Sequence, residues 1–184
     1  MATFLFNKVK KLKQNTGFTL VEALVAIIIL TLALGGPMTL ATRSIKDSLA
    51  AKNKVIAFYL AQEVIEYVRN VRDSNFLQRT MEDPKTTSWL NGLDDCFSSS
   101  DGCRIDVFDT ITPVQSCSGG CPKLKFDGTN YNYIAGTDSI FTRTINIDDT
   151  LNSGDEAEIT VTVEWTDYGD RTVTLTQNMF NLAP

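Results

Sequence analysis

The residues of this chain that could do chemistry are four cysteines and one isolated carboxylate, that of Glu22. Histidine is absent from all 184 residues, which excludes every catalytic or metal-binding mechanism that depends on imidazole. A cysteine nucleophile would lack a histidine base, and the sequence contains no nucleophile elbow and no phosphate-binding glycine loop. We therefore expect no catalytic residue, no metal site and no cofactor, and a protein that is not an enzyme.

The cysteines form two closely spaced pairs in a Ser-, Asp- and Gly-rich region, residues 76–122. Cys96 and Cys103 enclose six residues, and Cys117 and Cys121 enclose three. Zinc sites favour cysteines two to four residues apart, a spacing that only the second pair satisfies. Because a membrane segment precedes this region, we expect it outside the cytoplasm, where cysteines form disulfides. Of the three possible connectivities we favour the two local pairs.

Glu22 is the only charged residue between Lys13 and Arg43. The apolar segment around it, residues 18–39, would span roughly 33 Å as a helix, which matches the hydrocarbon core of a bilayer. This segment fits a cleaved secretory signal, a plain signal anchor or a specialised membrane helix. A carboxylate near the start of a membrane helix is costly unless a cation pairs with it, so Glu22 favours the specialised helix.

The charge of the chain is unevenly distributed. Residues 1–17 contain four lysines and no acidic residue, whereas the whole chain has a formal net charge of −5. A lysine-rich N-terminal segment before an apolar segment is typical of the end of a membrane protein that is not carried across the membrane. The acidic body does not offer the positive surface that attracts phosphates, so we expect no nucleic-acid partner. With 43% apolar residues, the composition is that of a globular protein and excludes a disordered chain.

The start of the apolar segment, residues 17–22 (GFTLVE), resembles the class III signal of type IV pilins and pseudopilins. The resemblance implies that a prepilin peptidase cuts between Gly17 and Phe18 and methylates Phe18, the new N-terminus. It also implies that the apolar helix stays on the mature protein. Glu22 then takes the acidic position of the family, and in a filament it would pair with the Phe18 ammonium of a neighbouring subunit. Such a buried pair would fix the register of assembly.

Beyond this segment the sequence predicts a second, amphipathic length of helix. Gly35-Gly36-Pro37 interrupts the helical pattern and predicts a kink, near which, by resemblance, pilin helices can loosen. The helix should then resume with an apolar stripe that packs against a sheet. The stripe comprises Ile45, Leu49, Ile56, Leu60, Val64, Val68 and Val71. Residues 61–70 resemble the helix end of V-type minor pilins and of type II secretion pseudopilin I. Asp73-Ser74-Asn75, all poor helix formers, predict that the helix ends there.

The last third of the chain predicts an antiparallel sheet. Asp127-Gly128 is a turn signal between two short apolar runs and predicts a hairpin. Further strands are expected around residues 141–147, 159–165 and 172–176, where apolar and polar residues alternate. One face of this sheet is apolar, and the helix stripe should cover it. The acidic loop 148–156 could coordinate calcium through oxygen ligands, but it lacks the EF-hand spacing, and we favour a solvated loop.

Together these expectations describe an α+β protein with the pilin fold, in which a long N-terminal helix packs on a C-terminal antiparallel β-sheet. We expect a leader peptide at 1–17, a transmembrane part at 18–42, an amphipathic part at 43–75 and an extracytoplasmic head at 76–184. The resemblance implies a minor type IV pilin-like subunit, held in the inner membrane before assembly and carried on a pilus or pseudopilus afterwards. Its implied partners are other pilin subunits, the prepilin peptidase, an inner-membrane assembly platform and membrane lipid. The alternatives are a pseudopilin of a type II secretion system and a membrane-anchored periplasmic enzyme or binding protein.

Overall fold

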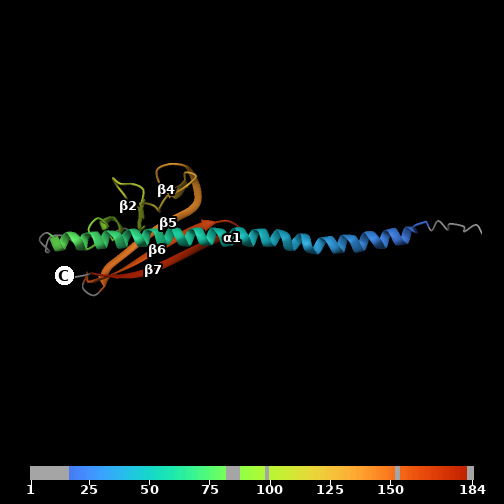
Figure 1. Cartoon of the computed structure of the whole chain (residues 1–184), viewed down its shortest axis with the longest axis horizontal. Helices are drawn as coiled ribbons and strands as arrows, with labels where there is room; N and C mark the ends of the chain where they lie inside the picture. The colour runs from blue at the N-terminus through green and yellow to red at the C-terminus, as the bar shows by residue number, and fades with distance from the viewer. Residues whose placement is uncertain (1–16, 82–87, 98–99, 152–153, 182–184) are drawn as a thin grey trace, which may run out of the picture. The chain divides into compact units, whose positions relative to one another are not determined.

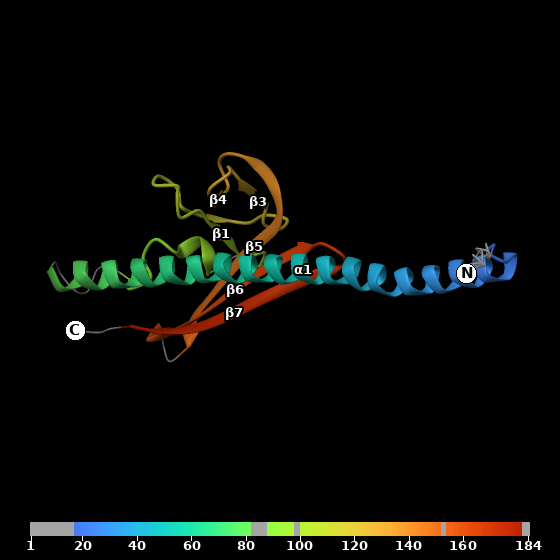
Figure 2. The same cartoon turned by 45° about the vertical axis from the view of Figure 1, so that its right-hand side comes forward.

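The computed structural model describes residues 17–81, 88–97, 100–151 and 154–181 (Figures 1 and 2). The chain divides into two compact units, with the boundary between Asp47 and Ser48. One helix, α1 (Leu20–Met81), begins in the first unit and ends in the second. Apart from Gly17, the expected leader peptide with its four lysines lies outside the described residues.

Helix α1 continues through the glycine–proline segment at which an interruption was expected. Its 62 residues include Pro37 in the interior. A proline removes only one backbone hydrogen bond, and this helix has many good helix formers on both sides of it. The Thr39 hydroxyl also donates to the Gly36 carbonyl at 2.8 Å, a side-chain hydrogen bond within the helix beside the proline. The segment is therefore helical, although the sequence pattern breaks there.

The expectation that the helix ends near Asn75 is wrong, because α1 runs on to Met81. Asn disfavours helix interiors since its side chain competes for nearby backbone groups. Here the Asn75 amide is engaged elsewhere, donating to the Trp89 and Asn91 carbonyls at 3.1 and 3.0 Å. Because these distant carbonyls bind the Asn75 side chain, it does not compete for the backbone groups of the helix, and the helix continues past it.

The second unit contains a short 3₁₀ turn, η1 (Asp94–Cys96), and a seven-stranded antiparallel sheet. The strands are β1 (Cys103–Ile105), β2 (Val114–Ser116), β3 (Lys123–Phe126), β4 (Tyr131–Asn132), β5 (Thr137–Leu151), β6 (Glu156–Thr166) and β7 (Asp170–Phe180). The long strand β5 pairs with β6 along one side and with β3 and β1 along the other, and β7 pairs with β6 (Figure 2).

Local sequence signals predict every strand of the sheet except β1 and β2. The predicted hairpin is confirmed: β3 and β4 pair with Phe126 opposite Tyr131, and Gly128 in the turn has a φ of 105°. The Asp127 carboxylate closes this turn by accepting the Thr129 and Asn130 amides, each at 2.8 Å. The strands β1 and β2 were not predicted, because three-residue strands in a Ser- and Gly-rich region are decided by their non-local partners.

The core of this unit lies between α1 and one face of the sheet, which confirms the predicted α+β architecture. Leu60, Val64 and Val68 of the predicted stripe are buried in the same cluster as the inward residues of β5 and β6. Ile45 and Leu49, at the start of the stripe, are exposed instead. The helix also buries residues outside the predicted stripe, namely Ala57, Ala61 and Ile65. The small side chains of the two alanines let the helix lie close to the sheet. Because alanine is only weakly hydrophobic, a search for large apolar residues did not place these two positions on the packing face.

Candidate functional site

The candidate processing site lies just before the first turn of α1. Gly17, Phe18 and Thr19 are outside the helix and exposed, and Phe18 exposes 74% of its surface. Thr19 is the N-cap: its hydroxyl accepts the Glu22 amide at 3.2 Å, and its carbonyl accepts the Ala23 amide at 3.1 Å. The Gly17–Phe18 peptide bond is therefore non-helical and accessible, while the helix start does not depend on residues before Thr19.

Glu22 occupies the first turn of α1 and is exposed. A carboxylate at this position interacts favourably with the positive end of the helix dipole. Within the described part of the chain its carboxylate forms no ion pair. The structure thus places Glu22 within one helical turn of Phe18, and the pairing of the two between subunits stays a prediction.

The part of α1 that follows Glu22 has no charged residue on any side until Arg43. From Gly17 to Leu49 each residue is exposed, apart from the half-buried Ala23. The threonines of this part satisfy their hydroxyls within the helix, as Thr31 does by donating to the Ile28 carbonyl at 2.9 Å. Among the described residues, α1 is one helix that is long and apolar enough to cross a membrane. A helix that is apolar all round needs lipid or other helices around it.

The four cysteines lie in the second unit as the two local pairs favoured above. Cys96 of η1 and Cys103 of β1 are joined, with their Cα atoms 4.8 Å apart, and both are buried in the core. Cys117 and Cys121 are joined with Cα atoms 4.9 Å apart. The described chain therefore carries no free thiol, and the first pair fixes η1 to strand β1, which lies between β2 and β5 in the sheet.

The acidic loop that was weighed as a calcium site is only partly described, since residues 152–153 lie outside the described ranges. The Asp148 carboxylate accepts the amide and the hydroxyl of Thr150, at 3.0 and 2.6 Å. These hydrogen bonds hold the pKa of Asp148 below its usual value. Asp148 and Thr150 belong to the end of β5, where its pairing with β6 shifts register, so the expected loop 148–156 is shorter than the sequence indicated.

A buried cation, Arg143, was not recognised from the sequence. It lies on β5 with 1% of its surface exposed, and its guanidinium donates to the Leu60 carbonyl of α1 at 2.8 Å and to the Ile105 carbonyl of β1 at 2.7 Å. The phenol ring of Tyr133 lies beside it, and burial is the largest influence that raises the pKa of Tyr133. The signal was available: Arg143 stands between Phe141 and Ile145 at an inward position of the alternating strand.

Comparison with known proteins identifies one family model. Residues 12–36 match the prokaryotic N-terminal methylation motif, the class III signal of type IV pilins. No curated protein and no solved structure matches the chain. The matched residues contain Gly17, Phe18 and Glu22, so the motif falls on the exposed segment and the first turn of α1.

The chain therefore carries a type IV pilin signal on an apolar N-terminal helix that packs against an antiparallel sheet. These features support a type IV pilin-like or pseudopilin protein, which is a structural subunit, and they suggest anchoring in a membrane through α1.

Proposed function

We propose that this chain is a minor type IV pilin-like subunit that assembles through α1 into a pilus or pseudopilus. The observation that carries the proposal is the coincidence of two features. The methylation motif falls on an exposed, non-helical Gly17–Phe18 bond, and the helix that follows is apolar on all sides. The minor role rests on the resemblance of residues 61–70 to the helix end of minor pilins.

Processing is the first step of this function. The prepilin peptidase cleaves between Gly17 and Phe18 and methylates Phe18, and the exposed bond before the Thr19 cap supports this step. Cleavage creates an ammonium at the positive end of the helix dipole, which is unfavourable by itself. A carboxylate one turn away, that of Glu22, offsets this charge.

Assembly follows from the same two charges. In the membrane the apolar part of α1 is surrounded by lipid, and in the filament it is surrounded by the helices of other subunits. The Glu22 carboxylate of one subunit pairs there with the Phe18 ammonium of its neighbour, so neither charge stays unpaired in the apolar interior. Because a misplaced subunit would leave both charges unpaired, the pair selects one register.

Before assembly the subunit is held in the inner membrane with its head outside the cytoplasm, and afterwards it lies in a filament at the cell surface. Its partners are other pilin subunits, the prepilin peptidase, the inner-membrane assembly platform and membrane lipid. The two disulfides of the head fit this location, because such bonds persist outside the cytoplasm.

Mass spectrometry of the mature N-terminus tests the proposal. We expect a chain that starts at N-methylated Phe18, and a Gly17→Val control that keeps its leader because a branched side chain blocks the cleaved bond. A mature chain that starts at Met1, or beyond Leu34, would contradict the proposal. Quantitative mass spectrometry of purified filaments would test the minor role, which requires far fewer copies of this chain than of the main subunit.

A further inference from the structure

Asn91 and Gly92 lie in an exposed turn of the second unit, in the segment between α1 and η1. The Leu93 amide closes this turn by donating to the Leu90 carbonyl at 3.1 Å. Gly92 has a φ of 88°, a left-handed conformation that favours glycine over residues with a side chain. A Cβ atom at Gly92 would meet no atom of a non-adjacent residue within 4 Å. The space around the Asn91–Gly92 peptide bond is therefore open.

An asparagine that precedes glycine reacts with its own main chain in water. The glycine nitrogen attacks the Cγ atom of the asparagine amide and forms a bond to it. The side-chain nitrogen leaves as ammonia and takes the proton that the glycine nitrogen gives up. Glycine suits this step because it has no Cβ atom to shield its nitrogen. The sequence contains Asn-Gly only at Asn91 and Gly92. The Gly92 N–H donates to the Asp94 carboxylate at 3.4 Å, a long hydrogen bond outside any helix or strand.

Water then opens the cyclic imide at either of its carbonyl carbons. Attack at Cγ breaks the new bond and leaves aspartate with the original main chain. Attack at the main-chain carbonyl carbon breaks the original peptide bond and leaves isoaspartate, in which the main chain runs through Cβ and Cγ. The former main-chain carbonyl of Asn91 then becomes a carboxylate on a branch, and the main chain is longer by the methylene group of Cβ. Neither route needs an oxidant or a reductant.

The Asn91 carbonyl, which isoaspartate formation would convert, has a partner in α1. The Asn75 amide donates to this carbonyl at 3.0 Å and to the Trp89 carbonyl at 3.1 Å, and Asn75 is only 6% exposed. These two bonds use both N–H groups of the Asn75 side chain. A longer main chain between Leu90 and Leu93 would change the turn that presents the Asn91 carbonyl. A buried N–H group of Asn75 would then lose its acceptor, which is destabilising.

We propose that Asn91 and Gly92 form a self-modification site, at which the folded chain loses ammonia and gains aspartate or isoaspartate. Isoaspartate at this site destabilises the end of α1, residues 75–81, through Asn75. Water is the co-reactant, so the reaction requires no enzyme and is independent of the proposed function. The glycine that the turn needs for its φ is also the glycine that leaves its nitrogen open to the reaction, so the site follows from the local fold.

Peptide mass spectrometry of the full chain, incubated in detergent at mildly alkaline and mildly acidic pH, tests the site. We expect the peptide that contains Asn91 to gain about 1 Da, the difference between an amide and a carboxyl group. The gain should be faster at alkaline pH, because the Gly92 nitrogen must lose its proton. Asn130 is the internal control: it is also exposed, in the turn between β3 and β4, but it precedes Tyr131.

Two variants locate the reaction. Asn91→Gln keeps an amide but would have to close a larger ring, so the mass gain at this position should disappear. Gly92→Ala places a methyl group beside the attacking nitrogen and should slow the gain several-fold. A gain at Asn91 that is no faster than the gain at Asn130, or one that occurs only in denaturant, would overturn the site.

Hydrogen–deuterium exchange tests the effect on α1. In chains that contain isoaspartate, detected by labelling with an isoaspartyl methyltransferase, the amides of residues 75–81 should exchange faster than in fresh chain. Asn91→Asp is the matched control, because it carries the same charge as the isoaspartate product on the original main chain, and it should keep its protection. Unchanged exchange in the isoaspartate fraction, or equally fast exchange in Asn91→Asp, would overturn the effect on α1.

Discussion

Arg143 of β5 and Glu63 of α1 form an ion pair between residues that stand 80 positions apart in the sequence, with Nη1 2.7 Å from Oε2. The Arg143 side chain is 1% exposed and the Glu63 side chain 31% exposed. Because the same guanidinium also binds carbonyls of α1 and β1, one side chain joins the helix to two strands of the sheet.

Removal of this cation should destabilise the head. For Arg143→Ala we expect the free energy of unfolding to fall by about 3–5 kcal/mol, because Glu63 and two buried carbonyls lose their partner. Chemical denaturation of the full chain in detergent measures the loss. Arg69→Ala is the matched control: it breaks the exposed pair with Glu66 and should cost less than about 1 kcal/mol. Equal losses in the two variants would show that Arg143 does not join the elements as described.

Replacement of the isolated carboxylate should separate membrane insertion from assembly. Glu22→Val makes the apolar segment more apolar, so we expect normal insertion into the membrane. We expect impaired incorporation into filaments, because the ammonium of Phe18 would lose its partner. The ratio of subunit in filaments to subunit in membranes measures this effect. Asp47→Asn removes an acidic residue from the same helix and should leave the ratio unchanged, whereas full incorporation of Glu22→Val would refute the pairing.

The two disulfides should differ in their contribution to stability. We expect that replacing Cys96 and Cys103 by serine lowers the free energy of unfolding by about 3–5 kcal/mol, since the change opens a loop and places two hydroxyls in the core. The same change at Cys117 and Cys121 opens a shorter loop outside the core cluster and should cost about 2 kcal/mol. Denaturation measures both. Non-reducing peptide mapping checks the pairing itself, and a cross-pair such as Cys96 with Cys117 would contradict it.

Two glycines with the same backbone conformation should respond differently to substitution. Gly136 and Gly128 have φ values of 106° and 105°. A Cβ atom at Gly136 would collide with the Phe126 carbonyl group, whereas one at Gly128 would meet no atom within 4 Å. We therefore expect Gly128→Ala to cost about 1 kcal/mol of backbone strain and Gly136→Ala to cost several-fold more. Thermal unfolding of both variants tests this order, and equal losses would contradict the close approach at Gly136.

Acid should weaken the turn between β3 and β4. Hydrogen bonds from the amides of Asn130 and Thr129 hold the pKa of Asp127 below its usual value. Since the folded-state pKa is the lower one, the ionised carboxylate stabilises the fold above the unfolded pKa of about 3.9 and loses this effect as the pH falls through the folded-state value. Asp127→Asn should reduce the loss of stability between neutral and acidic pH, measured by denaturation at a series of pH values. An unchanged pH profile would contradict this role of Asp127.

The features that could be read from the sequence are those decided by neighbouring residues. The apolar run of α1, the methylation motif at Gly17 and Phe18, and the Asp127-Gly128 hairpin each depend on a few consecutive positions. The alternation from Ile159 to Trp165 likewise identifies β6, because side chains of a strand point to opposite faces in turn. Local chemistry was sufficient for the α+β architecture and for the position of the methylation motif.

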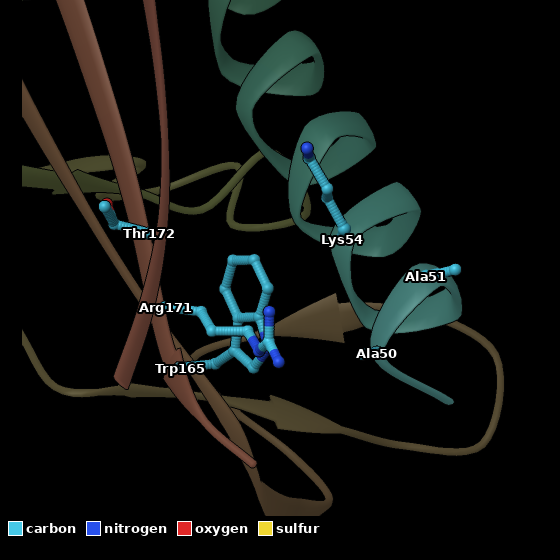
Figure 3. Close-up of a pocket in the computed structure, with 6 residues that line it drawn as sticks. All are labelled: Ala50, Ala51, Lys54, Trp165, Arg171 and Thr172. Atoms are coloured by element: carbon cyan, nitrogen blue, oxygen red, sulfur yellow. The ribbon is translucent and has the colours of Figure 1, made fainter. Parts of the chain in front are cut away.

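The remaining features depend on residues brought together by folding. Asn75 stays within α1 because distant carbonyls accept its amide, and Arg143 is tolerated in the core because α1 and β1 supply its acceptors. Lys54 of α1 and Arg171 of β7, far apart in sequence, line one hollow with Trp165 only because the fold brings the helix and the β6–β7 hairpin together (Figure 3). Propensity and periodicity describe what a segment prefers alone, whereas a buried polar group is stable only where the complete fold provides its partner.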